Sequence, residues 1–216
     1  VPVRALLGNH DAVLDGEGHY RQAYFPDGMK SDSGSAFFFS IDAGKVRFFV
    51  LHLIWGSESF DDAQRLWLET SLASTAPDVY KVVLSHSYFR ASGYVNSRSG
   101  QNWFDNAFNL RDVAPILSRH QVDLVVSGHN HFMEYLEGDG LHYALVGAMG
   151  GPSDSVPDHI SPASRWLLRG TTGFLELAAW KDRLELVFRD SSGTRLFSRT
   201  VAGPGSERLL SSTGGA

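Results

Sequence analysis

Three turns that carry histidine each follow directly on a short apolar run. The turns are residues 8–11 (Gly-Asn-His-Asp) after 3–7, residues 85–87 (Ser-His-Ser) after 82–84, and residues 127–131 (Ser-Gly-His-Asn-His) after 122–126. Imidazole is the commonest neutral metal ligand near physiological pH. Because ligands collect at the carboxyl ends of strands in layered α/β folds, this pattern predicts a metal site at one edge of a sheet.

Each of these residues also has a purely structural interpretation. His129 and His131 could be a structural pair in a turn, and His86 could cap a strand or fill a core. Asn9 tolerates the left-handed conformation that a turn after glycine needs. Asp11 could simply cap the segment that follows it. The occurrence of all three turns in one chain favours the metal site.

Length and composition limit the class of protein. The chain has 216 residues, 43% of them hydrophobic, which suits one sizeable globular domain. The formal net charge of -5 argues against a broad nucleic-acid footprint, so we expect no nucleic-acid partner. Cysteine is absent, which excludes thiolate metal sites. No apolar run approaches the roughly 20 residues of a spanning helix, so no membrane span is expected, and the compartment stays open.

The order of the predicted elements indicates the fold class. Apolar runs predict strands at 3–7, 35–41, 46–53, 80–84, 122–126, 132–137, 141–146, 173–180, 183–189 and 194–201, with helices at 17–25, 60–73 and about 109–118. Strand–helix units come first and hairpins follow. This order predicts an α/β fold, a four-layer α/β/β/α sandwich of two mixed β-sheets flanked by helices. Residues 1–202 form the predicted domain, and the Gly/Ser-rich residues 203–216 form a flexible tail.

Together the three turns resemble the motifs of the calcineurin-like metallophosphoesterase superfamily. The family pattern runs Asp-x-His, Gly-Asp, Gly-Asn-His-Asp/Glu, His and Gly-His-x-His, and its last three motifs occur here in that order. The later hairpin and the Gly-Ala-Met-Gly-Gly stretch at 147–151 also resemble the purple-acid-phosphatase-like branch. The resemblance covers most of the chain.

The resemblance implies a metal-dependent hydrolase that cleaves a small phosphoester, as a phosphatase or phosphodiesterase, with a metal-bound hydroxide. Its two ions, divalent or trivalent Fe, Mn or Zn, would be held by Asn9, His86 and His129 on one side and His131 on the other. His10 would contact the phosphate or protonate the leaving oxygen, and Asp11 would hold the His10 ring. Independently, an amide oxygen with imidazoles suits first-row ions, and two ions about 3.5–4 Å apart can clamp an in-line displacement.

The first two family motifs are missing. They supply most ligands of the first ion, including the carboxylate that bridges both, but only seven residues precede Gly8 and no Asp-x-His occurs anywhere. We therefore expect this chain to carry the second half of a dinuclear site, with the first strands of the fold also absent. By itself it would bind one ion or none and show little activity, because two close cations repel strongly without negative ligands.

Three explanations remain open for the missing half. The full-length chain could supply an N-terminal segment that lies outside these residues, a second polypeptide could supply it, or the chain could be a natural remnant that lost catalysis. The alternative function is a catalytically inactive metal-binding or interaction module on the same scaffold. A nuclease of the same superfamily is disfavoured by the acidic charge balance.

Residues 87–109 form a long segment without a clear period. Its Tyr88, Arg90 and Arg98 could bind substrate from a lid, with an arginine for the phosphate, or the segment could be a solvated loop with aromatic residues packed beneath it. We assign structural roles to the remaining histidines, which are His19, His52, His120, His142 and His159, and for His159 a contact with substrate stays open as an alternative.

Overall fold

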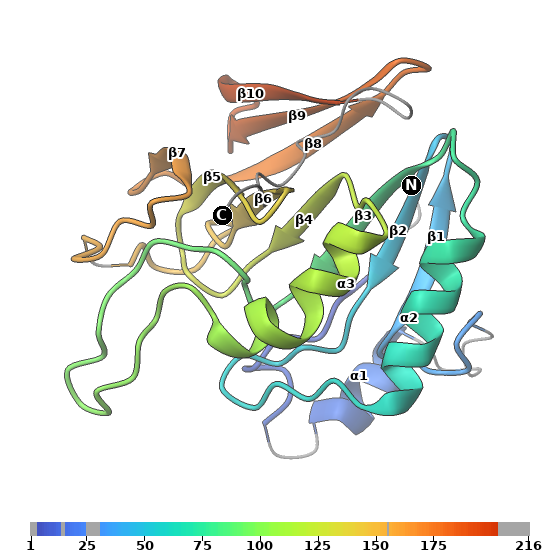
Figure 1. The fold of residues 1–216 in the computed structure, drawn as a ribbon. Coiled ribbons are helices and arrows are strands. Elements are labelled where there is room, and N and C mark those ends of the chain that lie inside the picture. The colour runs from blue at the N-terminus through green and yellow to red at the C-terminus, as the bar shows by residue number, and fades with distance from the viewer. Residues whose placement is uncertain (1–3, 14–15, 25–30, 155, 203–216) are drawn as a thin grey trace, which may run out of the picture.

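The computed structural model describes residues 4–13, 16–24, 31–154 and 156–202, which form two packed β-sheets with helices (Figure 1). The large sheet has the order β1-β2-β3-β4-β6-β5-β7. Its strands are β1 (Phe39–Ala43), β2 (Val46–Val50), β3 (Tyr80–Ser85), β4 (Leu124–Ser127), β5 (Met133–Gly138), β6 (Leu141–Val146) and β7 (Ser164–Leu168). The small sheet consists of β8 (Gly173–Ala179), β9 (Arg183–Asp190) and β10 (Arg195–Ala202).

The central strands of the large sheet run parallel and end at one edge. Strands β2, β3, β4 and β6 pair in parallel, and the antiparallel neighbours β1, β5 and β7 lie outside them. Strands β3 and β4 end in register, with Ser85 opposite Ser127. His86 and His129 follow these strands closely, so the pairing brings both to the same edge of the sheet.

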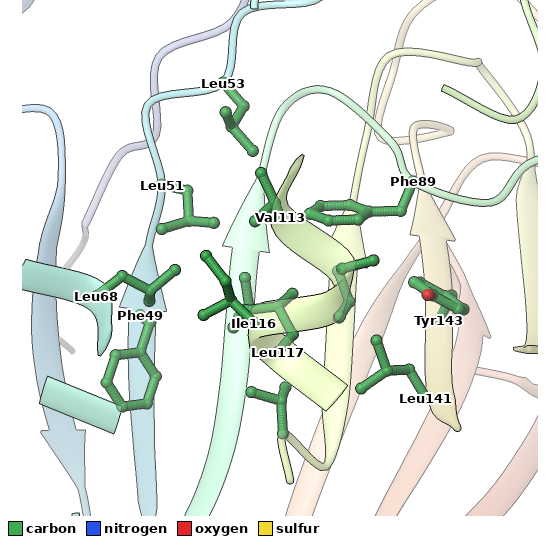
Figure 2. Packing of buried hydrophobic residues seen from close by; sticks show 14 of the residues in the cluster. Phe49, Leu51, Leu53, Leu68, Phe89, Val113, Ile116, Leu117, Leu141 and Tyr143 are labelled. Atoms are coloured by element: carbon green, nitrogen blue, oxygen red, sulfur yellow. The ribbon is translucent and has the colours of Figure 1, made fainter. Parts of the chain in front are cut away.

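Helices cover one face of the large sheet. They are α2 (Asp62–Ser74), the π-helical turn η1 (Asn109–Val113) and α3 (Ala114–Arg119). Helix α1 (Gly16–Tyr24) packs through Tyr20 on residues outside the strands, namely Leu7, Phe37 and Ile54. Leu68 of α2 and Leu117 of α3 are fully buried in one cluster with Phe49 of β2 (Figure 2). Removal of these side chains from water is the main force that holds the helices on the sheet.

The small sheet covers the opposite face of the large sheet (Figure 1). Leu184, Leu186 and Phe188 alternate along β9, are fully buried and share one cluster with Val82 and Leu124 of the large sheet. This period of two is what a strand with one buried face requires. The parallel strands β3 and β4 are therefore covered on both sides, as parallel strands usually are.

The predicted α/β fold with two packed sheets is confirmed. In the described residues the small sheet is antiparallel rather than mixed, and α2 and α3 lie on the large sheet, so three of the four predicted layers are seen. The predicted strand at 3–7 is wrong for the described residues 4–7, which pair with no strand. Strand β7 was not predicted. The predicted tail at 203–216 lies outside the described residues, and no described helix is long and apolar enough to cross a membrane.

The start of α2 gives a first testable prediction. The Asp61 side chain caps the helix by accepting a hydrogen bond of 2.8 Å from the Gln64 backbone N–H. Asp61→Ala should lower the free energy of unfolding by about 1 kcal/mol, because the N–H loses its acceptor. Urea denaturation measures this loss. The neighbouring Asp62→Ala keeps the cap and should cost less than half as much, and equal losses would contradict a capping role for Asp61.

Candidate metal centre

Three of the four predicted metal ligands lie together at the carboxyl edge of the large sheet. The rings of His86 and His129 are 5.4 Å apart between centroids and meet edge to face at 87°. The Asn9 Oδ1 atom lies 2.7 Å from His86 Nε2, although 77 residues separate them in the chain. An amide oxygen and an imidazole nitrogen this close can hold one proton between them, or one cation in its place.

The fourth predicted ligand, His131, is fixed by the loop after β6. Its Nδ1 lies 2.9 Å from the carbonyl oxygen of Pro152, which can only accept, so Nδ1 carries the proton and Nε2 keeps its lone pair. The His131 backbone N–H donates to Asp154 Oδ2 at 2.7 Å. A Cβ at Gly151 would lie 2.8 Å from the His131 ring, so only glycine lets the loop approach this closely.

The half-buried histidines His86 and His129 are neutral at physiological pH. Burial lowers the pKa of His86 to about 4, which the negative charge of Asp11 only partly opposes. Burial also lowers the pKa of His129 to about 3, and the neighbouring His86 and His131 lower it further. The His129 Nε2 atom is buried and has no hydrogen-bond partner among the described residues. A neutral imidazole with a free nitrogen is the form that binds metal.

Aromatic side chains hold the His129 ring in place. Trp55 stacks on it with centroids 4.1 Å apart and an interplanar angle of 11°, and Trp103 lies 5.3 Å away. The Trp55 indole in turn donates to the Tyr88 hydroxyl at 3.0 Å. His129 has a φ of 74°, in the left-handed region that is uncommon for residues other than glycine. Such strained residues cluster at functional sites, where their surroundings hold them.

Asn130, between the two histidines of the motif, anchors the long segment 87–109. It is fully buried, and its amide donates to the carbonyl oxygens of Ser92 at 3.0 Å and Trp103 at 3.1 Å. Sequence reasoning assigned no role to Asn130, Trp55 or Asp154. The position of Asn130 inside the histidine motif was a usable signal, whereas Trp55 and Asp154 lie in irregular segments where nothing in the sequence marks their partners.

The predicted acid–base pair lies in the turn at the start of the described chain. His10 and Asp11 are both exposed. The Asp11 Oδ2 atom accepts a hydrogen bond of 2.9 Å from the Gly8 backbone N–H, so its carboxylate closes this turn. This contact lies within the turn itself, so it differs from the capping of the following segment that was considered for Asp11. Two roles stay predictions: that Asp11 holds the ring of His10, and that His10 contacts a phosphate or protonates the leaving oxygen.

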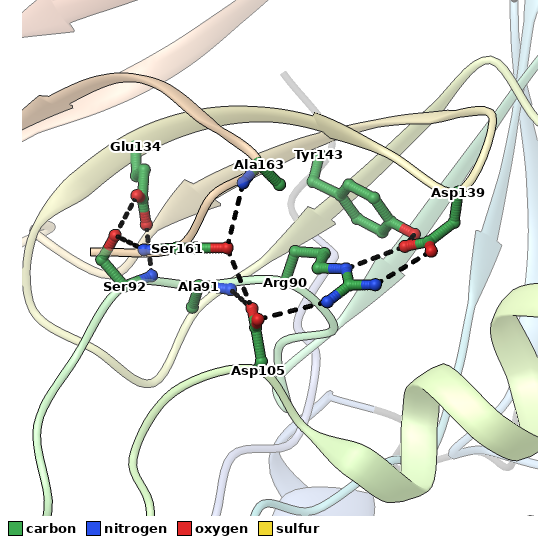
Figure 3. Close-up of polar contacts among 9 residues, drawn as sticks. All are labelled: Arg90, Ala91, Ser92, Asp105, Glu134, Asp139, Tyr143, Ser161 and Ala163. Atoms are coloured by element: carbon green, nitrogen blue, oxygen red, sulfur yellow. Dashed lines mark hydrogen bonds and ion pairs between the residues drawn. The ribbon is translucent and has the colours of Figure 1, made fainter. Parts of the chain in front are cut away.

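The contacts of Tyr88, Arg90 and Arg98 with substrate stay predictions, and the fold gives the first two side chains structural partners. Tyr88 is only 1% exposed and supports Trp55 from beneath. Arg90 binds both carboxylate oxygens of Asp139, at 2.8 and 2.9 Å, and also contacts Asp105 at 3.2 Å, so its guanidinium is occupied (Figure 3). Arg98 is exposed in a turn closed by hydrogen bonds to the preceding Asn96, and its contact with substrate stays a prediction.

Arg90 should therefore matter for stability. Arg90→Met should lower the free energy of unfolding at neutral pH by about 1–2 kcal/mol, because Asp139 and Asp105 lose their shared cation. Arg90 lowers the pKa of the Asp139 carboxyl, so this contribution is present above the ordinary value of 3.8 and is lost as the pH falls through the lowered one. Thermal unfolding between pH 3 and 7 tests this. Arg98→Met is the exposed control, and a loss that persists undiminished in acid would contradict the ion-pair account.

The donor set fits a metal ion only in part. The described residues contain no group of three or more His, Cys, Asp or Glu side chains arranged to hold a metal. They do contain the amide oxygen of Asn9 beside His86, and the buried, unpartnered nitrogen of His129. Neutral nitrogen and amide donors of this kind are what half of a dinuclear site would provide.

Comparison with known proteins places the chain in a family. The family model of the calcineurin-like phosphoesterases matches residues 1–133. No match was found among curated proteins. The fold is similar to that of the purple acid phosphatase PPD1 from yellow lupin (Lupinus luteus) seeds, with a TM-score of 0.65 and 20% identity over 81% of this chain and 34% of that one.

Two further solved structures share the fold. One is GAP50, described as the anchor in the inner membrane complex of Plasmodium, with a TM-score of 0.56 and 15% identity over 77% of this chain and 53% of that one. The other is PhoD, with a TM-score of 0.51 and 11% identity over 77% and 40%. The chain thus spans between about a third and about half of the length of these structures. Since the matched family model covers more than half of its residues, the chain belongs to the calcineurin-like phosphoesterase family.

Proposed function

We propose that the centre at the carboxyl edge of the large sheet is the second half of a dinuclear site that hydrolyses phosphoesters. The observation that carries this proposal is the contact of 2.7 Å between Asn9 and His86, with the free nitrogen of His129 beside it. Asn9, His86 and His129 would hold one ion, and His131 would hold the second through Nε2. Whether the enzyme is a phosphatase or a phosphodiesterase depends on the rim of the site.

The residues of this chain would bind the metal ions, hold the ligand rings in their orientation and protonate the leaving oxygen. When bound, the divalent or trivalent ions would polarise a phosphoryl oxygen and lower the pKa of the attacking water. Trp55 and Pro152 fix the rings of His129 and His131, so both nitrogens are set before a metal arrives. His10 is exposed beside the centre, where it would contact the phosphate or protonate the leaving oxygen.

The missing carboxylates would come from a further segment, either of the full-length protein or of a second polypeptide. A cavity of about 570 Å³ between the two sheets supports this. It is lined mainly by apolar side chains, among them Leu6, Phe48, Leu84, Val126 and Phe174. Strand β8 pairs only with β9 in the described residues, so its other edge is free to accept a strand.

The alternative function is a metal-binding or interaction module without catalysis. The absence of a complete metal-binding group from the described residues favours it, and GAP50, an anchor, shows this fold in a protein described by its structural role. Both functions use the same residues. They differ in whether a phosphoester is turned over.

Elemental analysis and hydrolysis assays on the purified protein test both functions. The protein is loaded with Mn, Zn or Fe and assayed with p-nitrophenyl phosphate and bis-p-nitrophenyl phosphate. Turnover that depends on bound metal supports the hydrolase. Stoichiometric metal without turnover supports the module. A protein that retains no metal after loading would contradict both, and two bound ions with turnover would show that no further segment is needed.

A further inference from the structure

A second cavity lies against the candidate metal centre. Its volume is about 280 Å³. Four of its lining residues are aromatic, namely Trp55, Tyr88, Phe104 and Phe108. Trp55 separates this cavity from the histidines by one ring, because the indole stacks on His129 at 4.1 Å. A group bound here would therefore lie across the Trp55 ring from His129.

The cavity also carries negative charge. Glu58 and Asp105 both line it. The Glu58 carboxylate is held by neutral donors, at 2.7 Å from Ser87 Oγ, 2.5 Å from Asn106 Nδ2 and 3.1 Å from the Gly56 N–H. No described Lys, Arg or His forms an ion pair with Glu58. These donors fix the carboxylate in place without neutralising its charge.

The second carboxylate is only partly compensated. Asp105 pairs with Arg90, but Arg90 binds Asp139 more closely. Of the two carboxylates that line the cavity, Glu58 has no ion-pair partner among the described residues, and Asp105 shares Arg90 with Asp139, which lies outside the cavity lining. Asp105 also has a φ of 31°, a strained backbone held by the Arg90 contact and by the Ala91 N–H.

Aromatic rings and uncompensated carboxylates together select one chemical class of ligand. Organic ammonium groups bind to the faces of aromatic rings and are attracted by nearby negative charge. The carboxylates would repel a phosphate, so the cavity and the histidine centre suit groups of opposite charge. Gln101, Asn102 and Ala107 are exposed lining residues, so the cavity opens to solvent between them.

We propose that this cavity binds the organic ammonium group of a phosphoester of an amino alcohol, with Glu58 as its charge partner and the aromatic residues as its walls. The adjacent histidine centre would hold the phosphate of the same molecule, and this half of the assignment rests on the proposed function. Ammonium recognition itself does not depend on hydrolysis.

Binding of a matched pair of probes tests the cavity directly. Choline and 3,3-dimethylbutan-1-ol have the same shape, but only choline is charged. Calorimetry should show that choline binds at least about tenfold more tightly. Glu58→Gln should remove most of this preference, whereas Glu69→Gln, on the exposed surface of α2, should keep it. Equal binding of the two probes, or unchanged preference in Glu58→Gln, would overturn the proposal.

A second variant and a second assay separate the possible failures. Phe108→Leu removes one wall without touching Glu58, so it should also lower choline affinity if Glu58→Gln proves unfolded. Phosphocholine and 3,3-dimethylbutyl phosphate then serve as substrates of the metal-loaded protein. Choline binding without hydrolysis of either ester, by a protein that carries both halves of the site, would support the cavity and refute the hydrolase. Hydrolysis of both esters with equal kcat/KM would support the hydrolase and overturn the cavity proposal.

Discussion

In a protein that carries both halves of the proposed site, replacement of His86 with alanine should lower metal-dependent phosphoester hydrolysis by more than about a hundredfold. Even residues that merely orient a metal ligand typically contribute 10–100-fold to affinity or activity, and His86 would be a ligand itself. The substitution also leaves Asn9 Oδ1 without its partner at 2.7 Å. Bound metal measured by elemental analysis should fall together with activity, because the same nitrogen serves both.

His120→Ala is the matched control for this prediction. His120 lies at the C-terminal end of α3, before β4, whereas His129 of the candidate centre follows β4. His120 therefore lies at the opposite end of this strand from the centre. The His120 variant should keep its metal and its activity. Thermal unfolding checks that the His86 variant is folded. A folded His86→Ala protein with full metal content would show that Asn9 and His86 form a structural contact only.

Glu134→Ala should lower the free energy of unfolding by about 2–4 kcal/mol. Glu134 is fully buried on β5 and accepts two hydrogen bonds from Ser92, one of 2.8 Å from the backbone N–H and one of 2.5 Å from Oγ (Figure 3). The Ser92 Oγ atom in turn accepts from the Ser161 N–H at 3.0 Å. The alanine would leave buried donors without an acceptor, which is among the costlier effects of a single substitution.

Two further variants separate the hydrogen bonds of Glu134 from its charge. Burial raises the pKa of the Glu134 carboxyl above 4.5, with the charge of Asp105 adding to the effect, so the folded state holds this proton more tightly than the unfolded state. The contribution of Glu134 to stability is therefore greatest below pH 4.5 and declines as the pH rises through the raised pKa. Glu134→Gln does not titrate. Its stability relative to the wild type should improve as the pH rises.

Urea denaturation at several pH values measures these effects. Glu176→Ala removes an exposed glutamate that pairs with Arg189, and it should cost less than about 1 kcal/mol. If Glu134→Ala were no more destabilising than Glu176→Ala, Glu134 would not hold β5, the segment at Ser92 and the segment at Ser161 together. A pH-independent difference between Glu134→Gln and the wild type would contradict the raised pKa.

The positions of the histidines could be predicted from sequence because local patterns determine them. Apolar runs identified β3 and β4, and parallel strands deliver the residues after them to one edge. Asn9 also contacts His86, but this contact does not follow from the rule, because the strand predicted at residues 4–7 is absent. That error has a physical cause. Strand propensity describes how a segment fits a sheet, and it does not reveal whether a partner strand is present.

The side chains around the histidines could not be predicted, because distant partners determine their roles. Arg90 looked free to bind phosphate, yet Asp139, 49 residues away, occupies its guanidinium. Glu58 lies in an irregular segment, and only folding places it beside the rings of Phe104 and Phe108. Strand β7 was missed for the same reason, since its pairing with β5 spans some 30 residues. Sequence patterns predict elements better than the contacts between irregular segments.

Segment 87–109 has two parts, a base that is hydrogen-bonded to the rest of the fold and an exposed tip. Asn130 and the bridge between Gly93 and His159 hold the base against the histidines. Beyond them, Val95 pairs with Asn102 and closes an exposed turn at 96–101. We expect that residues can be inserted into or deleted from this turn without moving the candidate metal centre, since exposed loop tips tolerate such changes. Evolution, or a protein engineer, can thus reshape what approaches the site while its chemistry stays intact.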